Sequence, residues 1–126
     1  YLLTALQHIQ PIRAMIDSTI FQEIRELLPA DQWPSIMREL FDSDSSDVKL
    51  LVAMITGGDD RQAIGNQAHK LKGSSLLLGL KDLSAFAARI EHTARHTNAD
   101  IAPEEATELL QLAADTQVAL QAKLAD

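Results

Sequence analysis

The chain has 126 residues, of which 46% are hydrophobic, which is enough for the core of one domain. Its 11 basic and 18 acidic residues give a net charge of −7, which argues against nucleic acid as a partner. The lack of cysteine excludes disulfides and thiolate metal sites, and no apolar run reaches the roughly 18–20 residues that a membrane span needs. We therefore expect a domain without direct membrane contact.

The first sixteen residues have apolar positions at helical spacing, but Pro11 interrupts them. Residues 1–16 are therefore interpreted as a linker or a short N-terminal helical segment, and residues 17–126 as the domain itself. Asp17 or Ser18 can cap a helix that Pro29 stops. Its predicted apolar stripe consists of Ile20, Ile24, Leu27 and Leu28.

A further helix is predicted from Asp31, its cap, to about Ile55, with Pro34 in the first turn. The polar stretch 42–47 is poor helix-forming material, and it either breaks this helix or lies on its solvated side. Gly57 and Gly58 end it.

Asp59 or Asp60 then caps a helix with two distinct faces. The predicted core stripe comprises Ile64, Ala68, Leu71, Ser75 and Leu78. The other face carries Gly65, His69, Lys72, Gly73 and Leu76.

Two more helices complete the chain, the last beginning near Pro103. The predicted buried stripe of the first consists of Leu83, Phe86, Ala87, Ile90 and Ala94. That of the last consists of Leu109, Leu110, Leu112, Ala113, Val118, Leu120 and Leu124. Four amphipathic helices joined by short turns predict an all-α fold, an antiparallel four-helix bundle with an additional short N-terminal helix or helices. One such core uses most of the apolar stripes, so we expect a monomer.

His69 is the strongest candidate for chemistry, whereas His8 has the features of an ordinary surface residue. A glycine inside a helix costs about 0.5–1 kcal/mol relative to alanine, and Gly65 and Gly73 lie four residues before and after His69. Lys72 shares this face. No phosphate-binding loop and no serine–histidine–acid arrangement is recognisable. A lone histidine beside a lysine suits a phosphoryl group carried on nitrogen, with the glycines leaving access for its donor.

Charge along this helix favours an acidic partner. No acidic residue lies between Arg61 and Lys81, and the segment contains four basic residues, Arg61, Lys70, Lys72 and Lys81. This cluster within an acidic domain indicates a docking face for an acidic site.

The octet 68–75, AHKLKGSS, followed by Gly79, Leu83 and the pair Ile90-Glu91, resembles the histidine-containing phosphotransfer (HPt) family. The resemblance covers about residues 18–120. It implies that His69 accepts a phosphoryl group from a receiver-domain aspartate and passes it to another receiver. It further implies no cofactor in this domain, with Mg²⁺ on the partner receiver. It suggests a cytoplasmic domain at the C-terminus of a hybrid sensor histidine kinase, whose parent chain could be anchored in the inner membrane.

The resemblance also assigns roles to the neighbours of His69. Lys72 corresponds to the lysine near the phosphoryl group, Gly73 to the small residue that gives access, and Glu91 to the residue that orients the imidazole. The expected docking surface for the receiver consists of Gly65, Lys70, Leu76, Leu80 and Lys81.

Two other readings stay open. His92 and His96 lie one turn apart and could bind Zn²⁺ or Cu²⁺, although a third and fourth ligand are not evident, and no metal site is expected. Alternatively, the chain is a helical protein-interaction module in which His69 is incidental.

Overall fold

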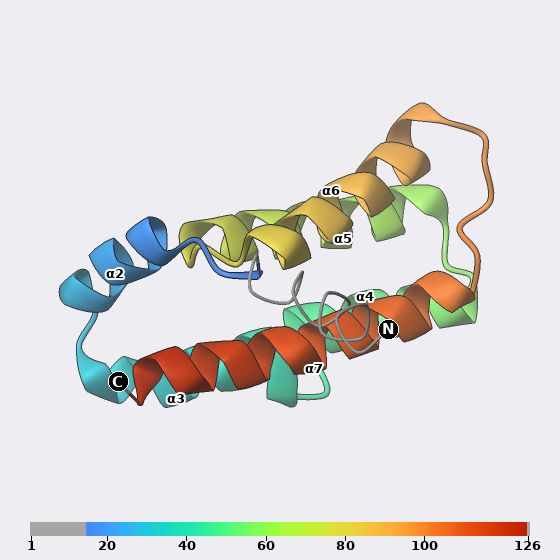
Figure 1. Ribbon diagram of the computed structural model, residues 1–126. Helices are drawn as coiled ribbons and strands as arrows, with labels where there is room; N and C mark the ends of the chain where they lie inside the picture. The colour runs from blue at the N-terminus through green and yellow to red at the C-terminus, as the bar shows by residue number, and fades with distance from the viewer. Residues whose placement is uncertain (1–14, 126) are drawn as a thin grey trace, which may run out of the picture.

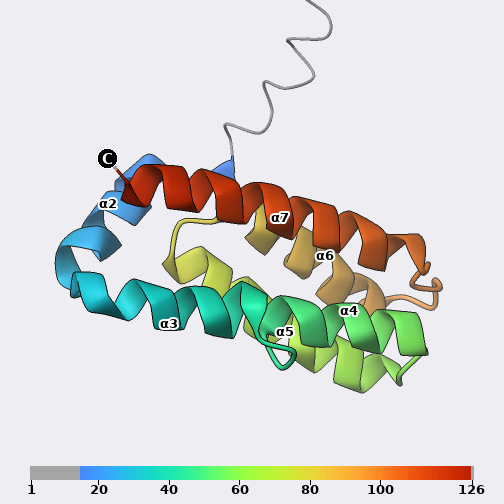
Figure 2. The same cartoon turned by 90° about the horizontal axis from the view of Figure 1, so that it is seen from below.

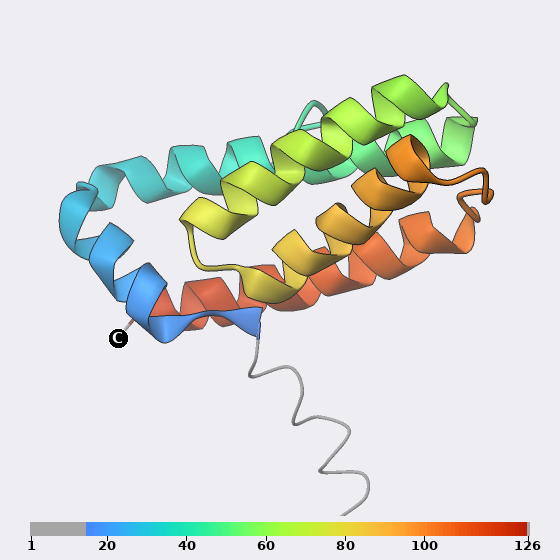
Figure 3. The same ribbon diagram turned by 90° about the horizontal axis from the view of Figure 1, so that it is seen from above.

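The computed structural model describes residues 15–125. Within them lie the helices α2 (Ser18–Leu27), α3 (Trp33–Met37), α4 (Asp47–Gly57), α5 (Arg61–Leu77), α6 (Lys81–His96) and α7 (Glu104–Leu124). Helices α4 to α7 run alternately up and down, so sequence neighbours are antiparallel (Figures 1 and 3). The predicted all-α four-helix bundle is confirmed.

Helix α2 closes one end of the bundle, beside the C-terminal end of α7 (Figure 2). Asp17 caps it through the backbone N–H groups of Thr19 and Ile20. Arg25 donates hydrogen bonds to the carbonyls of Lys123 and Leu124, which lie at the end of α7, where no further helical turn supplies donors. The additional helix of the prediction is therefore present, although segment 1–14 lies outside the described residues.

The start of α2 also rests on the turn between α5 and α6. Gly79 has a φ of +76°, and a Cβ at this position would lie 2.9 Å from the carbonyl oxygen of Asp17. The N–H of Asp17 in turn donates to the Gly79 carbonyl at 2.6 Å. Both the left-handed backbone and the close approach require glycine at this turn.

The helix predicted from Asp31 to Ile55 is interrupted at the polar stretch. Helix α3 continues into a π-helical turn, η3 (Arg38–Asp42), and the chain is extended at Ser43. Ser43 Oγ accepts the N–H of Ser45 and Ser46 caps α4, so local side-chain bonds replace helical ones. The prediction that Asp31 caps the helix is wrong, because a 3₁₀ turn, η2 (Ala30–Gln32), contains it.

The core lies between the helix pair α5–α6 and the helix pair α4–α7. Its largest fully buried side chains are Leu51, Leu71, Leu80, Leu83, Ile90, Leu109 and Leu120. The predicted stripe of α5 is buried from Ile64 to Leu78. Three residues predicted to be buried are exposed instead, namely Leu27, Leu110 and Val118. Met15 and Ile16, the described residues before position 17, are buried, so the domain includes the end of the predicted linker. No helix within residues 15–125 is long and apolar enough to cross a membrane.

Candidate functional site

His69 lies near the middle of α5, on the side of the helix pair that faces solvent. Asp60 caps α5 and the pair α5–α6 runs side by side along the bundle (Figure 3). Small residues allow this approach: Ala68, Ser75 and Ala87 are fully buried, and Ser84 Oγ donates to the carbonyl of Lys72 at 3.3 Å. The His69 side chain remains 60% exposed, in agreement with its predicted separation from the core stripe.

Glu91 of α6 reaches His69 of α5. Its Oε2 lies 2.8 Å from His69 Nδ1, whereas the Glu91 residue as a whole is buried. A carboxylate accepts hydrogen bonds only, so this contact selects the imidazole tautomer with the proton on Nδ1. The other ring nitrogen, Nε2, then carries the free lone pair. The structure thus brings together the two residues that the resemblance paired.

Lys72 contacts the other oxygen of the same carboxylate, with its Nζ 2.6 Å from Glu91 Oε1. This hydrogen bond is the main cause that lowers the pKa of the Glu91 carboxyl below its ordinary value of 4.5. The contact with His69 acts in the same direction, and burial opposes both. Glu91 is therefore ionised at neutral pH despite its buried position.

Arg95 is a member of this site that the sequence analysis did not identify. Its Nη1 lies 2.6 Å from Glu91 Oε2, and its Nη2 donates to Asn66 Oδ1 at 2.8 Å. The spacing of four residues between Glu91 and Arg95 on one helix is the signal that could have revealed it. Glu91 thus accepts from three donors, two on α5 and one on α6.

The two glycines that flank His69 have different surroundings. A Cβ at Gly73 would meet nothing within 4 Å, so the fold itself does not require glycine there. Gly65 is buried instead, and a Cβ there would lie 3.0 Å from Cγ and Nε of Arg95. The expectation that Gly65 belongs to an open docking surface is wrong, because the Arg95 side chain covers it.

The remaining residues of the expected docking surface also divide. Leu76 is 56% exposed and lies two turns beyond His69 on α5, where an apolar contact with a partner is feasible. Lys81 is exposed at the start of α6. Leu80 is fully buried in the turn before α6, so its assignment to the docking surface is wrong. A leucine side chain that is packed in the core is not available for contact with a partner.

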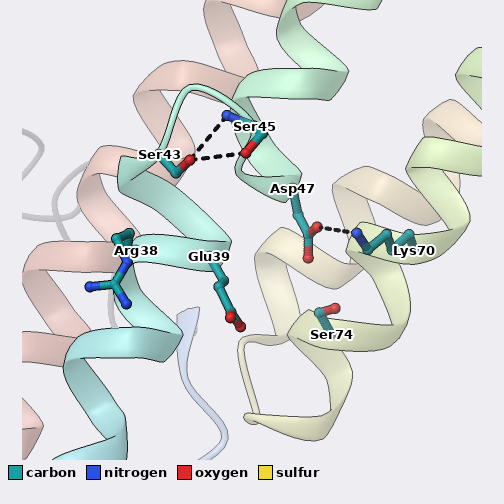
Figure 4. A pocket seen from close by; sticks show the side chains of 7 residues that line it. All are labelled: Arg38, Glu39, Ser43, Ser45, Asp47, Lys70 and Ser74. Atoms are coloured by element: carbon teal, nitrogen blue, oxygen red, sulfur yellow. Dashed lines mark hydrogen bonds and ion pairs between the residues drawn. The ribbon is translucent and has the colours of Figure 1, made fainter.

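Two of the four basic residues in the predicted positive cluster, Lys70 and Lys72, pair with acidic side chains of neighbouring helices. Arg61 donates to the backbone carbonyls of Thr93, Ala94 and Thr97, and thereby caps the C-terminal end of α6. Lys70 Nζ lies 3.2 Å from Asp47 Oδ1, an ion pair that links α5 to α4 (Figure 4). Counting charges along one helix missed the acidic partners on its neighbours.

Asp47 and Lys70 also border a polar pocket of about 330 Å³ between η3, α4 and α5 (Figure 4). Its other lining residues are Arg38, Glu39, Ser43, Ser45 and Ser74. The two acidic and two basic side chains leave no net charge, so the pocket does not favour an ion of either sign.

His92 and His96 lie together at the exposed end of α6, with ring centroids 5.4 Å apart. Within residues 15–125, no group of three or more histidine, cysteine, aspartate or glutamate side chains could hold a metal ion. The pair alone does not supply the three or four ligands of a protein zinc site.

Comparison with known proteins agrees with the histidine site. The family model described as "Hpt domain" matches residues 18–122, from the first residue of α2 nearly to the end of α7. No curated protein and no solved structure matches the chain. The family match spans most of the sequence and includes the α5–α6 pair with His69, Lys72 and Glu91. The chain therefore belongs to the Hpt domain family.

Proposed function

We propose that this domain is a phosphorelay intermediate in which His69 accepts a phosphoryl group from a receiver-domain aspartate and passes it to another receiver. Membership of the Hpt family supports the general role, histidine phosphotransfer in two-component signalling through receiver domains. The contact between Glu91 Oε2 and His69 Nδ1 is the single observation that carries the assignment of the acceptor.

In the proposed step, the lone pair of His69 Nε2 attacks the phosphorus of the receiver's aspartyl phosphate. A new N–P bond forms as the P–O bond to the aspartate breaks, and the aspartate leaves as a carboxylate. The proton on Nδ1 stays in its hydrogen bond to Glu91, so no proton need leave the ring. As positive charge develops on the imidazole, the buried Glu91 carboxylate stabilises it. In transfer to a second receiver, the N–P bond breaks as a P–O bond to that receiver's aspartate forms.

Lys72 supplies a positive charge that stabilises the negatively charged phosphoryl group. Its ammonium lies on the same helix face as His69, three residues away, and is 34% exposed. A flexible lysine stem can turn from Glu91 toward the phosphoryl oxygens, where a charge-assisted hydrogen bond would form. Gly73 leaves the next turn of this face without a side chain, which keeps a path open for the receiver. The exposed Leu76 offers the receiver an apolar contact.

This division of labour places no cofactor in the domain, and Mg²⁺ is expected on the receiver that donates or accepts the group. We likewise expect the domain to act as a monomer, since the described apolar stripes are mostly used in one core. The parent chain is expected to be a hybrid sensor histidine kinase.

The test is direct labelling by a phosphorylated receiver. The domain is incubated with a receiver carrying ³²P on its aspartate, and the label is assayed for the acid lability and base stability of phosphohistidine. We expect His69→Gln to take up no label, whereas His92→Gln should label like the wild type. Labelling of His69→Gln at the wild-type rate would contradict the proposal and favour an interaction module in which His69 is incidental.

A further inference from the structure

The buried Glu91 carboxylate depends on hydrogen-bond donors that do not all remain available during transfer. Lys72 contacts Oε1, while His69 and Arg95 share Oε2. The proposed function requires Lys72 to turn toward the phosphoryl group. A buried carboxylate that loses its partners is costly, and it would be free to rotate away from the imidazole. Another group must therefore hold it during the step.

Arg95 has the geometry for this task. It donates at 2.6 Å to the oxygen that faces His69 Nδ1, so it holds the carboxylate through the oxygen that Lys72 does not contact. Its second terminal nitrogen is held by Asn66 at 2.8 Å. Because both guanidinium nitrogens are engaged, one on each helix, the side chain is fixed in position rather than merely near the site.

Gly65 explains how the arginine fits. The Arg95 stem crosses α5 at this residue, with Cγ and Nε only 3.0 Å from where a Cβ would lie. Glycine inside α5 weakens the helix, and the three atoms nearest to a Cβ at this position all belong to Arg95. The cost of this glycine is thereby linked to the path of Arg95.

We propose that Arg95, seated over Gly65 and anchored by Asn66, is the positioning residue that keeps Glu91 aligned with His69 when Lys72 turns to the phosphoryl group. This inference rests on the proposed phosphorelay role of His69. It assigns to Gly65 a purpose within the site in place of the docking role expected from the sequence.

The experiment compares three variants in the labelling assay, namely Arg95→Met, Arg95→Lys and Gly65→Ala. Arg95→Met should slow transfer about tenfold, the effect of losing one charge-assisted hydrogen bond. Arg95→Lys should recover part of the rate, since an ammonium can reach Glu91 but cannot also hold Asn66. Gly65→Ala should slow transfer by a smaller factor, because Arg95 must shift by a few tenths of an ångström. In the Arg95→Met background, Gly65→Ala should have no further effect.

A merely structural role is distinguished by imidazole ¹⁵N NMR and by a matched control. Arg95→Met should lower the fraction of His69 with its proton on Nδ1. Arg89→Met, which removes the α6 arginine paired with Glu105, should change neither the tautomer nor the rate. Wild-type rates and tautomer in Arg95→Met would overturn the inference, as would an additive effect of Gly65→Ala. Uptake of label by His69→Gln would instead refute the phosphorelay role itself.

Discussion

Glu91 Oε2 lies 2.8 Å from His69 Nδ1 across the interface between α6 and α5, and this contact determines which ring nitrogen is available for chemistry. His69 is mostly exposed, but its orientation is set by a buried residue of the neighbouring helix. A carboxylate in this position both selects the tautomer and stabilises positive charge that develops on the ring. The orientation and tautomer of the imidazole thus depend on the packing of two helices.

Replacing Glu91 separates hydrogen bonding from charge. Glu91→Gln retains an oxygen that can accept from Nδ1, so it should keep the tautomer and slow transfer only severalfold, whereas Glu91→Ala should slow it by about 10–100-fold. Transfer kinetics and imidazole ¹⁵N shifts measure both effects. Equal rates for Glu91→Ala and the wild type would remove the orienting role.

Removal of the Lys72 ammonium should weaken stabilisation of the phosphoryl group. We expect Lys72→Ala to slow transfer from a phosphorylated receiver by about 10–100-fold, the range of hydrogen bonds to charged groups. Lys49→Ala on α4, which removes a lysine bound to the Asp42 carbonyl, is the matched control and should transfer normally. If both variants transfer equally well, Lys72 has no electrostatic role.

Gly73 predicts opposite effects on stability and on activity. No atom would contact a Cβ at this position, so Gly73→Ala should stabilise the domain by about 0.5–1 kcal/mol through helix propensity alone. The added methyl group stands on the approach to His69 and should slow transfer. Urea unfolding and labelling measure the two effects, and a stabilised variant with undiminished transfer would show that access does not require glycine.

Much of this fold could be predicted from the sequence because its signals are local. The caps Asp17, Asp60 and Gly58 and the buried stripe of α5 follow from residue type and spacing within one helix. The location of His69 outside that stripe follows in the same way. Leu110 and Val118 were wrongly predicted to be buried, because the apolar residues of α7 extend beyond the helix face that packs in the bundle.

The site could be predicted less completely from the sequence, because its key contacts join different helices. The apparent positive cluster of α5 ignored Asp47 and Glu91, which pair with Lys70 and Lys72. The spacing of Glu91 and Arg95 could have indicated their ion pair, but only the fold brings Arg95 over Gly65. Glu91 itself was found through family resemblance, since nothing in its own helix distinguishes it from a solvated residue.

Ser75 offers a test of the α5–α6 interface apart from the chemistry. Its hydroxyl is fully buried, and within residues 15–125 it has no hydrogen-bond partner. Removing a buried, unsatisfied polar group is favourable, so Ser75→Ala should raise the free energy of unfolding by about 1 kcal/mol. Transfer should be unchanged, because the side chain faces the core. Urea denaturation decides the matter, and a destabilised Ser75→Ala would indicate that the hydroxyl is hydrogen-bonded in solution.

The lowered pKa of Glu91 predicts a specific acid sensitivity. Because the hydrogen bond from Lys72, together with His69, holds the folded-state pKa below the ordinary 4.5, ionised Glu91 favours the folded state. This contribution is complete above about pH 4.5 and is lost as the pH falls from there through the lowered value.

Unfolding of wild type and Glu91→Gln by urea at a series of pH values measures this contribution. Their stability difference should be constant near neutrality and should change, at the expense of the wild type, below about pH 4.5. The same comparison in a Lys72→Ala background should show a smaller change, because the main cause of the lowered pKa is then absent. A difference that does not vary with pH would show that Glu91 has the same proton affinity in the folded and unfolded chains.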